Sequence, residues 1–373
     1  MSDNELEPIL AGMLSDHCGP DQRRRDENGE WCGELWALLD SAGVTSLSNP
    51  EELGGQGGEL EDACLVLRLA GRSAVPLPLA EHGFLAGWML SRSGVPIPDG
   101  VLTVGVDPAP DLRLRSTAGG WRVKGTVRRV PWARHADWLV AFAATADGPR
   151  VVAIPLSEEM ITHGTNLAGE ARDAVEFDDV PVNDALVARP GEGVDAESFR
   201  LRGALTRGLL MSGALEHVVK LTVEYAWVRH QFGRPIANFQ AVQQHLVRLN
   251  AESTAAGLAV QSAVARHASG DPARFELAAA KQLTSHAATL ATALAHQVHG
   301  AIGMTEEYEL QQYTRRLMSW RQEFGSSRFW AARIGEQVVA GGADLLWPRI
   351  SDTMNGRDGL ESLRAGQQPA SVG

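Results

Sequence analysis

The chain has 373 residues, of which 44% are hydrophobic and 21% charged, and its formal net charge is −12. This length allows two or three domains with a large core, and the acidic balance disfavours a general nucleic-acid binder, because phosphate recognition needs a basic face. Cys18, Cys32 and Cys64 form neither a CxxC pair nor a metal-binding spacing, as is typical of reduced cytosolic thiols. No apolar run approaches the ~20 residues of a membrane span and the first residues lack a signal-peptide pattern, so we expect a cytoplasmic protein without a membrane segment.

Residues 1–100 are predicted to form a helical domain, because apolar residues recur at helical spacing over residues 31–39 and 63–69. Between these segments, residues 49–58 contain four glycines within five positions. No lysine follows them and no strand precedes them, which excludes a Walker-type phosphate loop and favours an interhelix turn.

Residues 101–195 have a different pattern. Residues 121–125 alternate with period two, residues 138–142 and 151–154 are short apolar runs, and residues 176–182 are a further strand candidate. Proline or glycine separates several of these runs. Short strands with frequent turn signals predict a small β barrel or sandwich.

Residues 196–348 are predicted to form a helical bundle of the four-helix type. The first helix has one buried stripe and ends near Arg229. Strong helix formers predict further helices at 251–268, 277–295 and 329–339, and 349–373 is expected to be a polar tail. The order of helices, strands and helices predicts an α+β multidomain fold, with the β domain between two helical ones.

The histidines give no metal signal. None of those on the expected helical faces or turns shows HxxxH or HxxE spacing, so we expect packed or solvated side chains and no metal site; these residues are His217, His245, His286, His296 and His299. No G-x-S-x-G string is present, so hydrolase chemistry lacks a recognisable nucleophile.

Two strings in the C-terminal region carry the functional signal. The first, YAWVRHQFGRPIANFQ (225–240), ends a helix with Arg229 and then turns on Gly-Arg-Pro; alone, Arg229 is explained as a cation near a helix C-terminus. The second, QVHGAIGMTEEY (297–308), follows later. Together, in this order, they resemble the C-terminal domain of the acyl-CoA dehydrogenase flavoproteins. The string PEELGGQG (50–57) resembles the N-terminal domain of that family, and residues 125–138 resemble its middle domain.

The resemblance implies FAD as the cofactor. In the family, the arginine of R-x-x-F-G meets the FAD pyrophosphate and the phenylalanine packs near the adenine, which are Arg229 and Phe232 here. Arginine suits this role because its fork matches phosphate oxygens. Gln240 is a further cofactor-binding candidate, although packing or an interhelix hydrogen bond also explains it.

The second string implies further FAD contacts from a neighbouring subunit. In the family, the Q-V-x-G-x-x-G turn supplies the Gln297 side chain and the backbone at Val298, Gly300 and Gly303. Glycine allows the backbone to approach a cofactor without a Cβ. Without the resemblance, Gln297 is a surface amide at a helix end and the glycines form an ordinary turn.

The implied reaction is the α,β-desaturation of an acyl-CoA thioester, in which a carboxylate removes the α-proton and the flavin takes the β-hydride. The family places that base directly before a glycine, where this chain has Phe324 before Gly325; Glu323 is one residue early, and one residue rotates a helical side chain by about 100°. Some members carry the base on the helix before the arginine motif, and the matching place, near Gly203, holds no carboxylate. Glu323 is therefore the catalytic candidate only if the turn is remodelled.

Two positions in the middle domain also depart from the family. Residues 104–110 stand where the family has a TEPxxGSD signature. Pro131 falls where a serine or threonine normally donates to the flavin ring, and proline has no N–H to donate.

Three functional hypotheses remain open. The string YTRRLMSWRQEFG (313–325) resembles actinobacterial members that act on steroid-derived or other bulky acyl-CoA thioesters, often as α2β2 heterotetramers in which one subunit type lacks the base. The first hypothesis is such a subunit, with a homologous chain and an electron-transfer flavoprotein as partners. The second is a self-sufficient homotetrameric dehydrogenase that uses Glu323, and the third is a non-catalytic acyl-CoA-binding or assembly protein. Arg202 and Arg207 flank the expected place of a CoA-contacting arginine without occupying it.

Overall fold

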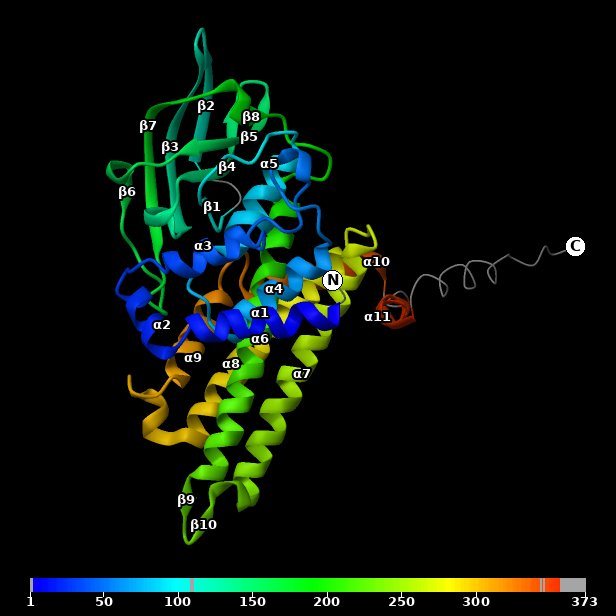
Figure 1. Ribbon diagram of the computed structural model, residues 1–373. Coiled ribbons are helices and arrows are strands. Elements are labelled where there is room, and N and C mark those ends of the chain that lie inside the picture. Colours follow the sequence, from blue (N-terminus) through cyan, green and yellow to red (C-terminus); the bar gives the residue numbers. More distant parts are fainter. Residues whose placement is uncertain (1–2, 108–110, 343, 345, 356–373) are drawn as a thin grey trace, which may run out of the picture.

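The computed structural model in Figure 1 describes residues 3–107, 111–342, 344 and 346–355. A β-sheet lies at one end, long helices extend from it to the opposite end, and short N-terminal helices pack against the bundle near the sheet. This arrangement confirms the predicted fold class. Within the described ranges, no helix combines the length and the hydrophobicity that crossing a bilayer requires.

The N-terminal region consists of short helices. They are α1 (Asp3–His17), α2 (Pro20–Glu27), α3 (Gly33–Ser41), α4 (Leu60–Arg72), the π-helix η2 (Ala80–Gly87) and α5 (Trp88–Arg92). The glycine-rich loop before α4 packs closely on itself, since a Cβ built on Gly55 would lie 2.1 Å from the Asn49 carbonyl oxygen. Close packing of this kind agrees with the predicted interhelix turn.

The middle region is a β-sheet with its own apolar core. Its strands are β1 (Leu102–Val104), β2 (Asp111–Thr117), β3 (Gly120–Pro131), β4 (Trp138–Thr145), β5 (Gly148–Pro155), β6 (Ile161–Thr162), β7 (Arg172–Val182) and β8 (Val187–Ala188). Over the described residues the order is β6-β7-β3-β2-β4-β5-β8, with β1 parallel to β4. Alternating burial directs Leu112, Leu114 and Phe177 into one core, which is why these segments form strands. The four predicted strand segments lie within β3, β4, β5 and β7.

The C-terminal region is built from long helices and one hairpin. These are α6 (Ala196–Val228), β9 (His230–Gln231), β10 (Arg234–Pro235), α7 (Gln240–Ala268), α8 (Arg274–His299), α9 (Leu310–Trp320), α10 (Ser327–Gly341) and α11 (Leu346–Asn355). The side chain of Asp195 caps the start of α6, and the helix ends just before Arg229, as predicted. α11 continues past residue 348, where a polar tail was expected to begin; residues 356–373 lie outside the described part of the chain.

Helix α6 connects two distant parts of the molecule. Its N-terminal half passes beside the sheet and the N-terminal helices, and its C-terminus reaches the far end, at the hairpin of β9 and β10 (Figure 1). Gly203 and Arg229 are separated by about 39 Å along this axis, at 1.5 Å per residue. The two sets of residues singled out in the sequence therefore lie at opposite ends of one helix.

Candidate functional site

The Arg229 motif forms the distal tip of the bundle. The backbone N–H of Arg229 donates to the Tyr225 carbonyl oxygen (2.9 Å) and closes the last turn of α6. The chain then reverses between β9 and β10, where Phe232 and Gly233 have φ of 51° and 79°. Positive φ at both central residues is what a tight two-residue hairpin requires. This geometry leaves the Phe232 side chain 92% exposed.

Two arginines at this tip have no acidic partner. Within the described residues, neither Arg229 nor Arg234 takes part in an ion pair. The Arg234 guanidinium lies 4.3 Å from the centre of the Phe239 ring, and the Phe232 and Phe239 rings are 6.1 Å apart. These two guanidinium groups without a described acidic partner lie near the half-buried Phe239 ring, which Arg234 covers, and the exposed Phe232 ring. Such a combination fits a ligand that carries both phosphate and a planar base.

The Gln297 turn lies at the same end of the bundle. Gln297 is exposed in the last turn of α8, whereas Val298 is buried in a small cluster with Ala226 and Ala237. Ala226 precedes Arg229 on α6, and Ala237 follows the hairpin. The structure thus brings the two strings of the sequence together, and Gln240, the first residue of α7, is exposed beside them.

The two glycines of this turn serve different purposes. Gly300 has a φ of +64°, and a Cβ built on it would meet nothing within 4 Å, so its backbone is open to a ligand. Gly303 is buried, and a Cβ there would lie 3.0 Å from both His299 Cβ and Leu310 Cδ2. Gly303 therefore serves packing, which the sequence could not distinguish from cofactor approach.

An aromatic stack joins the two strings, and sequence reasoning missed it. The rings of Tyr225 and His299 stack at 4.4 Å, and Tyr308 lies against both, at 5.9 and 5.1 Å. The Tyr225 hydroxyl donates to the His299 carbonyl oxygen (3.3 Å). All three residues fall within the quoted strings, but nothing in the spacing indicates that their rings meet.

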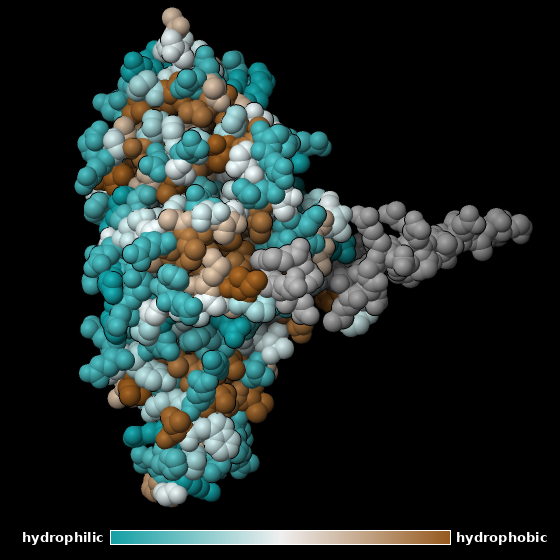
Figure 2. Space-filling view, viewed as in Figure 1, coloured by the Kyte–Doolittle hydropathy of each residue, from teal (hydrophilic) through white to brown (hydrophobic). Residues whose placement is uncertain are grey.

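Apolar side chains are also exposed at this end, where Figure 2 shows brown surface among polar residues. They are Trp227, Val228 and Phe232, with Val247 further along α7, and each is more than half exposed. Exposed apolar residues gathered at one place are typical of a surface that contacts another chain or a ligand.

At the other end of α6, Glu323 is held by two buried arginines. Its carboxylate accepts from Arg172 Nε (2.7 Å) and Arg207 Nε (2.6 Å), and Arg207 also pairs with Glu81 of η2 (2.5 Å). Burial by itself would raise the pKa of Glu323, but the two guanidinium groups outweigh it and lower the pKa to about 2. A carboxylate with both oxygens occupied and so low a pKa is a poor proton acceptor, so the geometry argues against the predicted catalytic role of Glu323.

Phe324 and Gly203, the two positions where the family pattern places a base, are in direct contact. A Cβ built on Gly203 would lie 2.1 Å from Phe324 Cδ1, so the ring lies flush against the backbone of α6. Phe324 has a φ of 53°, and its ring packs against Phe199, which in turn meets Phe142. Aromatic side chains therefore fill the space in which the sequence comparison expected a carboxylate.

Pro131, at the position expected to face a flavin ring, makes its hydrogen bond within this chain. The Pro131 carbonyl accepts a hydrogen bond from Thr103 Oγ1 (2.5 Å), and proline has no N–H. Of the neighbouring segment 104–110, which replaces the expected signature, residues 108–110 lie outside the described residues. The hairpin end of the bundle, with Arg229 and Arg234, thus fits the pyrophosphate of a dinucleotide. The region around Phe324 and Pro131 fits a flavin ring poorly.

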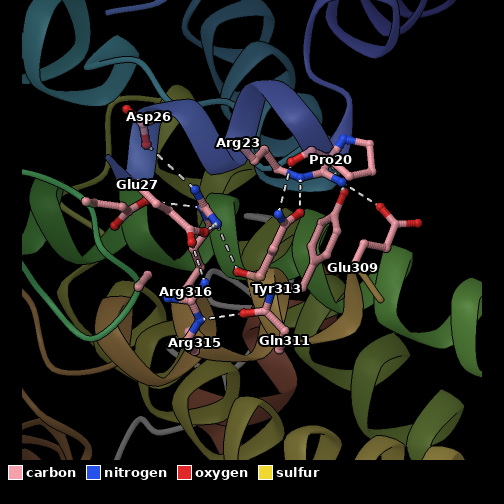
Figure 3. Close-up of polar contacts among 12 residues, drawn as sticks. Pro20, Arg23, Asp26, Glu27, Glu309, Gln311, Tyr313, Arg315 and Arg316 are labelled. Carbon is pink, nitrogen blue, oxygen red and sulfur yellow. Dashed lines mark hydrogen bonds and ion pairs between the residues drawn. The ribbon is translucent and has the colours of Figure 1, made fainter. Parts of the chain in front are cut away.

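The ion network around Glu323 extends to the N-terminal helices. Arg172 also pairs with Glu170 (3.1 Å), and Glu170 lies 3.4 Å from Arg316 of α9. Figure 3 shows the outer end of this network, where Arg316 points toward Asp26 and Glu27 of α2. Charged contacts between residues far apart in the sequence therefore tie together all three regions of the chain.

A separate cavity of about 480 Å³ lies where α5, the start of α6 and the loop between α7 and α8 meet. Its charged and titratable lining consists of Arg92, Arg202, Arg274, His267, Glu192, Asp195 and Asp271. Asp271 is paired with Arg266 (3.2 Å). Arg274 is likewise paired, with Glu197 (2.8 Å). The lining therefore has as many arginines as carboxylates, and among the described residues Arg92 and Arg202 are its arginines without an ion pair.

Arg202 is the most unusual residue of this cavity. It is 8% exposed, no described carboxylate pairs with it, and its guanidinium lies between the Phe84 and Trp88 rings at 4.2 and 5.0 Å. Its Nε donates to the Phe84 carbonyl oxygen (2.7 Å). Burial lowers the pKa of Arg202 to about 10, so it remains charged at neutral pH. A buried cation without a paired anion fits an anionic ligand.

Comparisons with known proteins agree with this geometry. Residues 6–96 match the model of the acyl-CoA dehydrogenase N-terminal domain, and residues 198–339 match that of the C-terminal domain. The acyl-CoA dehydrogenase IpdE2 of Mycobacterium tuberculosis is 30% identical over 343 residues, which cover 89% of this chain and 96% of IpdE2. The chain belongs to the acyl-CoA dehydrogenase family.

Solved structures with the same fold match nearly the whole chain. The ChsE4–ChsE5 complex from Mycobacterium tuberculosis has a chain with a TM-score of 0.81 and 26% identity, covering 90% of this chain and 96% of that one. The steroid ACAD Tcur3481–Tcur3483 shares the fold, with a TM-score of 0.80 and 23% identity over 91% of this chain and 98% of that one. Acyl-CoA dehydrogenases are FAD-dependent oxidoreductases. The cofactor that the residues at the two ends of α6 would contact is therefore FAD.

Proposed function

We propose that this chain is a subunit of a heteromeric acyl-CoA dehydrogenase, in which it completes an FAD site and a homologous chain supplies the catalytic carboxylate. The observation that carries the proposal concerns Phe324 and Gly203, which occupy the two family positions for the base. Neither residue has a carboxylate, and the Phe324 ring packs directly against the backbone of Gly203. The network that holds Glu323 against Arg172 and Arg207 supports the same conclusion.

The length of α6 supports a cofactor shared between chains. Arg229 lies about 39 Å from Gly203 along the helix, well beyond the reach of one dinucleotide. The distal tip of this chain therefore serves an FAD whose flavin ring lies in another chain. In that role Arg229 neutralises the pyrophosphate, Phe232 covers the adenine, and Gln297 and the backbone at Val298 and Gly300 hold the polar tail, with Gln240 beside them. Gly303 lets the turn pack closely and does not itself contact the cofactor.

Two of the similar solved structures suggest the assembly and the substrate class. ChsE4–ChsE5 and Tcur3481–Tcur3483 are named as two-component proteins, and the latter as a steroid enzyme. We place this chain in a comparable cytoplasmic complex that desaturates a steroid-derived or other bulky acyl-CoA and passes electrons to an electron-transfer flavoprotein. Bound FAD would accept the hydride; this chain would bind and orient the cofactor without moving the proton.

The test is expression of this chain alone and together with a homologous acyl-CoA dehydrogenase chain. In each preparation the flavin absorption spectrum is recorded and a panel of acyl-CoA thioesters, including steroid side-chain ones, is assayed. We expect the chain alone to lack FAD and turnover, and the pair to gain both. A yellow, active preparation of the chain alone would overturn the proposal in favour of a self-sufficient homotetramer.

The cavity at Arg202 favours a second candidate function. An acyl-CoA-binding protein without catalysis needs cations for the CoA phosphates and no base. This cavity offers Arg92 and Arg202, whereas Arg274 is paired with Glu197. In this reading the chain binds CoA thioesters by itself, whether or not FAD is present.

Arg202→Met tests the second candidate. We expect it to weaken CoA binding about tenfold or more, because one charge-assisted contact contributes about 1.5–3 kcal/mol, while the melting temperature stays the same or rises because a buried unpaired charge is removed. Isothermal titration with CoA measures the first effect and thermal unfolding the second. Arg113→Met, on the exposed face of β2, is the matched control. Equal CoA affinity in both variants would remove the cavity from consideration.

A further inference from the structure

A buried lysine on α8 donates hydrogen bonds to the turn that contains Glu323 and Phe324. Lys281 is fully buried, and its Nζ donates to the carbonyl oxygens of Arg321 (2.9 Å) and Gly325 (3.2 Å) and to Ser285 Oγ (3.3 Å). In its charged form this group has three protons, which match the three acceptors. The side chain therefore bridges the first and last residues of the turn formed by residues 321–325.

This turn needs external support. Phe324 has a φ of 53° and Gly325 a φ of 106°, both in the left-handed region, which a phenylalanine adopts only at a cost. The turn also follows the end of α9, where helix carbonyl groups lack intrahelical donors. Trp330 Nε1 donates to the Phe324 carbonyl oxygen (3.2 Å), and Lys281 serves the carbonyls on either side.

Keeping a lysine here is costly, which indicates a specific role. Burial lowers the pKa of Lys281 to about 7, although the nearby Glu323 carboxylate raises it. An apolar residue would fill the same space without that cost, but it would leave two carbonyl oxygens of the turn without donors.

We infer that Lys281 is the positioning residue that holds residues 321–325 in the form that seats Phe324 against Gly203. It acts through the backbone of the turn, not on substrate or cofactor. The inference rests on the proposed function in one respect, since it explains how Phe324 continues to fill the place of the missing base.

The test uses the full chain alone, without FAD or a partner. In Lys281→Met we expect the amide hydrogens of residues 321–325 to exchange at least about tenfold faster than in the wild type, because the turn opens locally. The resonance of the Trp330 indole N–H should also shift, because its acceptor is the Phe324 carbonyl. Lys220→Met, an exposed change on α6, is the matched control and should alter neither.

A second variant guards against loss of folding. Lys281→Gln keeps an N–H donor on an uncharged side chain that is one bond shorter, and it should give intermediate exchange in the turn. A purely structural role for Lys281 would lower the melting temperature while exchange at residues 321–325 and the Trp330 resonance stayed as in the wild type; that result in either variant overturns the inference. Because neither readout involves a partner chain, the heteromer proposal can fail independently.

Discussion

Arg229→Ala is expected to weaken FAD binding by the assembled complex about 10- to 150-fold. The reason is that no described carboxylate pairs with Arg229, and a charge-assisted hydrogen bond to pyrophosphate contributes about 1.5–3 kcal/mol. The measurement is the dissociation constant for FAD after the complex is stripped and reconstituted. The FAD affinity of Arg229→Lys should lie between those of the wild type and Arg229→Ala, because lysine keeps the charge and lacks the forked guanidinium.

The controls for this experiment separate cofactor binding from assembly. Arg113→Ala removes another exposed arginine, on β2, and should leave FAD affinity unchanged. Size-exclusion chromatography shows whether the Arg229 variant still assembles. Normal FAD content in an assembled Arg229→Ala complex would mean that the distal tip does not contact the pyrophosphate.

Glu323→Gln is expected to lower the free energy of unfolding by about 3–5 kcal/mol and to leave turnover of the assembled complex intact. The loss arises because Arg172 and Arg207 remain buried after their shared carboxylate is neutralised. Denaturant titration gives the stability, and acyl-CoA turnover is measured below the transition. Glu224→Gln, exposed on α6, is the control. If Glu323 were instead the base, the variant would lose turnover by about 10²- to 10⁴-fold with little change in stability.

The pH dependence gives a second check on Glu323. Its folded pKa of about 2 lies below the ordinary 4.5, so the folded state holds this proton more weakly than the unfolded state. The stabilisation is therefore fully present above pH of about 4.5 and is lost as the pH falls towards about 2. The difference in unfolding free energy between the wild type and Glu323→Gln should shrink over that interval. A constant difference would mean that the ion pairs are not its source.

Much of the fold follows from local patterns. The alternating segment 121–125, the two short apolar runs and the strand candidate 176–182 lie in β3, β4, β5 and β7, and the helix predicted to end near Arg229 does so. Alternation, apolar runs, helical stripes and helix ends are all properties of neighbouring residues, which is why the sequence predicts them. The family assignment was also carried by local strings and is confirmed by both matching domain models. The roles of the residues in those strings remain predictions, although the structure brings the two strings together at one end of the bundle.

The sequence alone determined the family, the order of helical and β regions and the absence of a carboxylate at positions 203 and 324, because each depends only on residue identity and spacing. Only the tertiary structure decided where Glu323 points, what Phe324 fills and which groups hold the turn. Those answers depend on Arg172, Arg207 and Lys281, which come from separate elements and meet this turn only when the sheet, α6 and α8 pack together. A left-handed residue at Phe324 further redirects the chain, and helical counting cannot anticipate that change of direction.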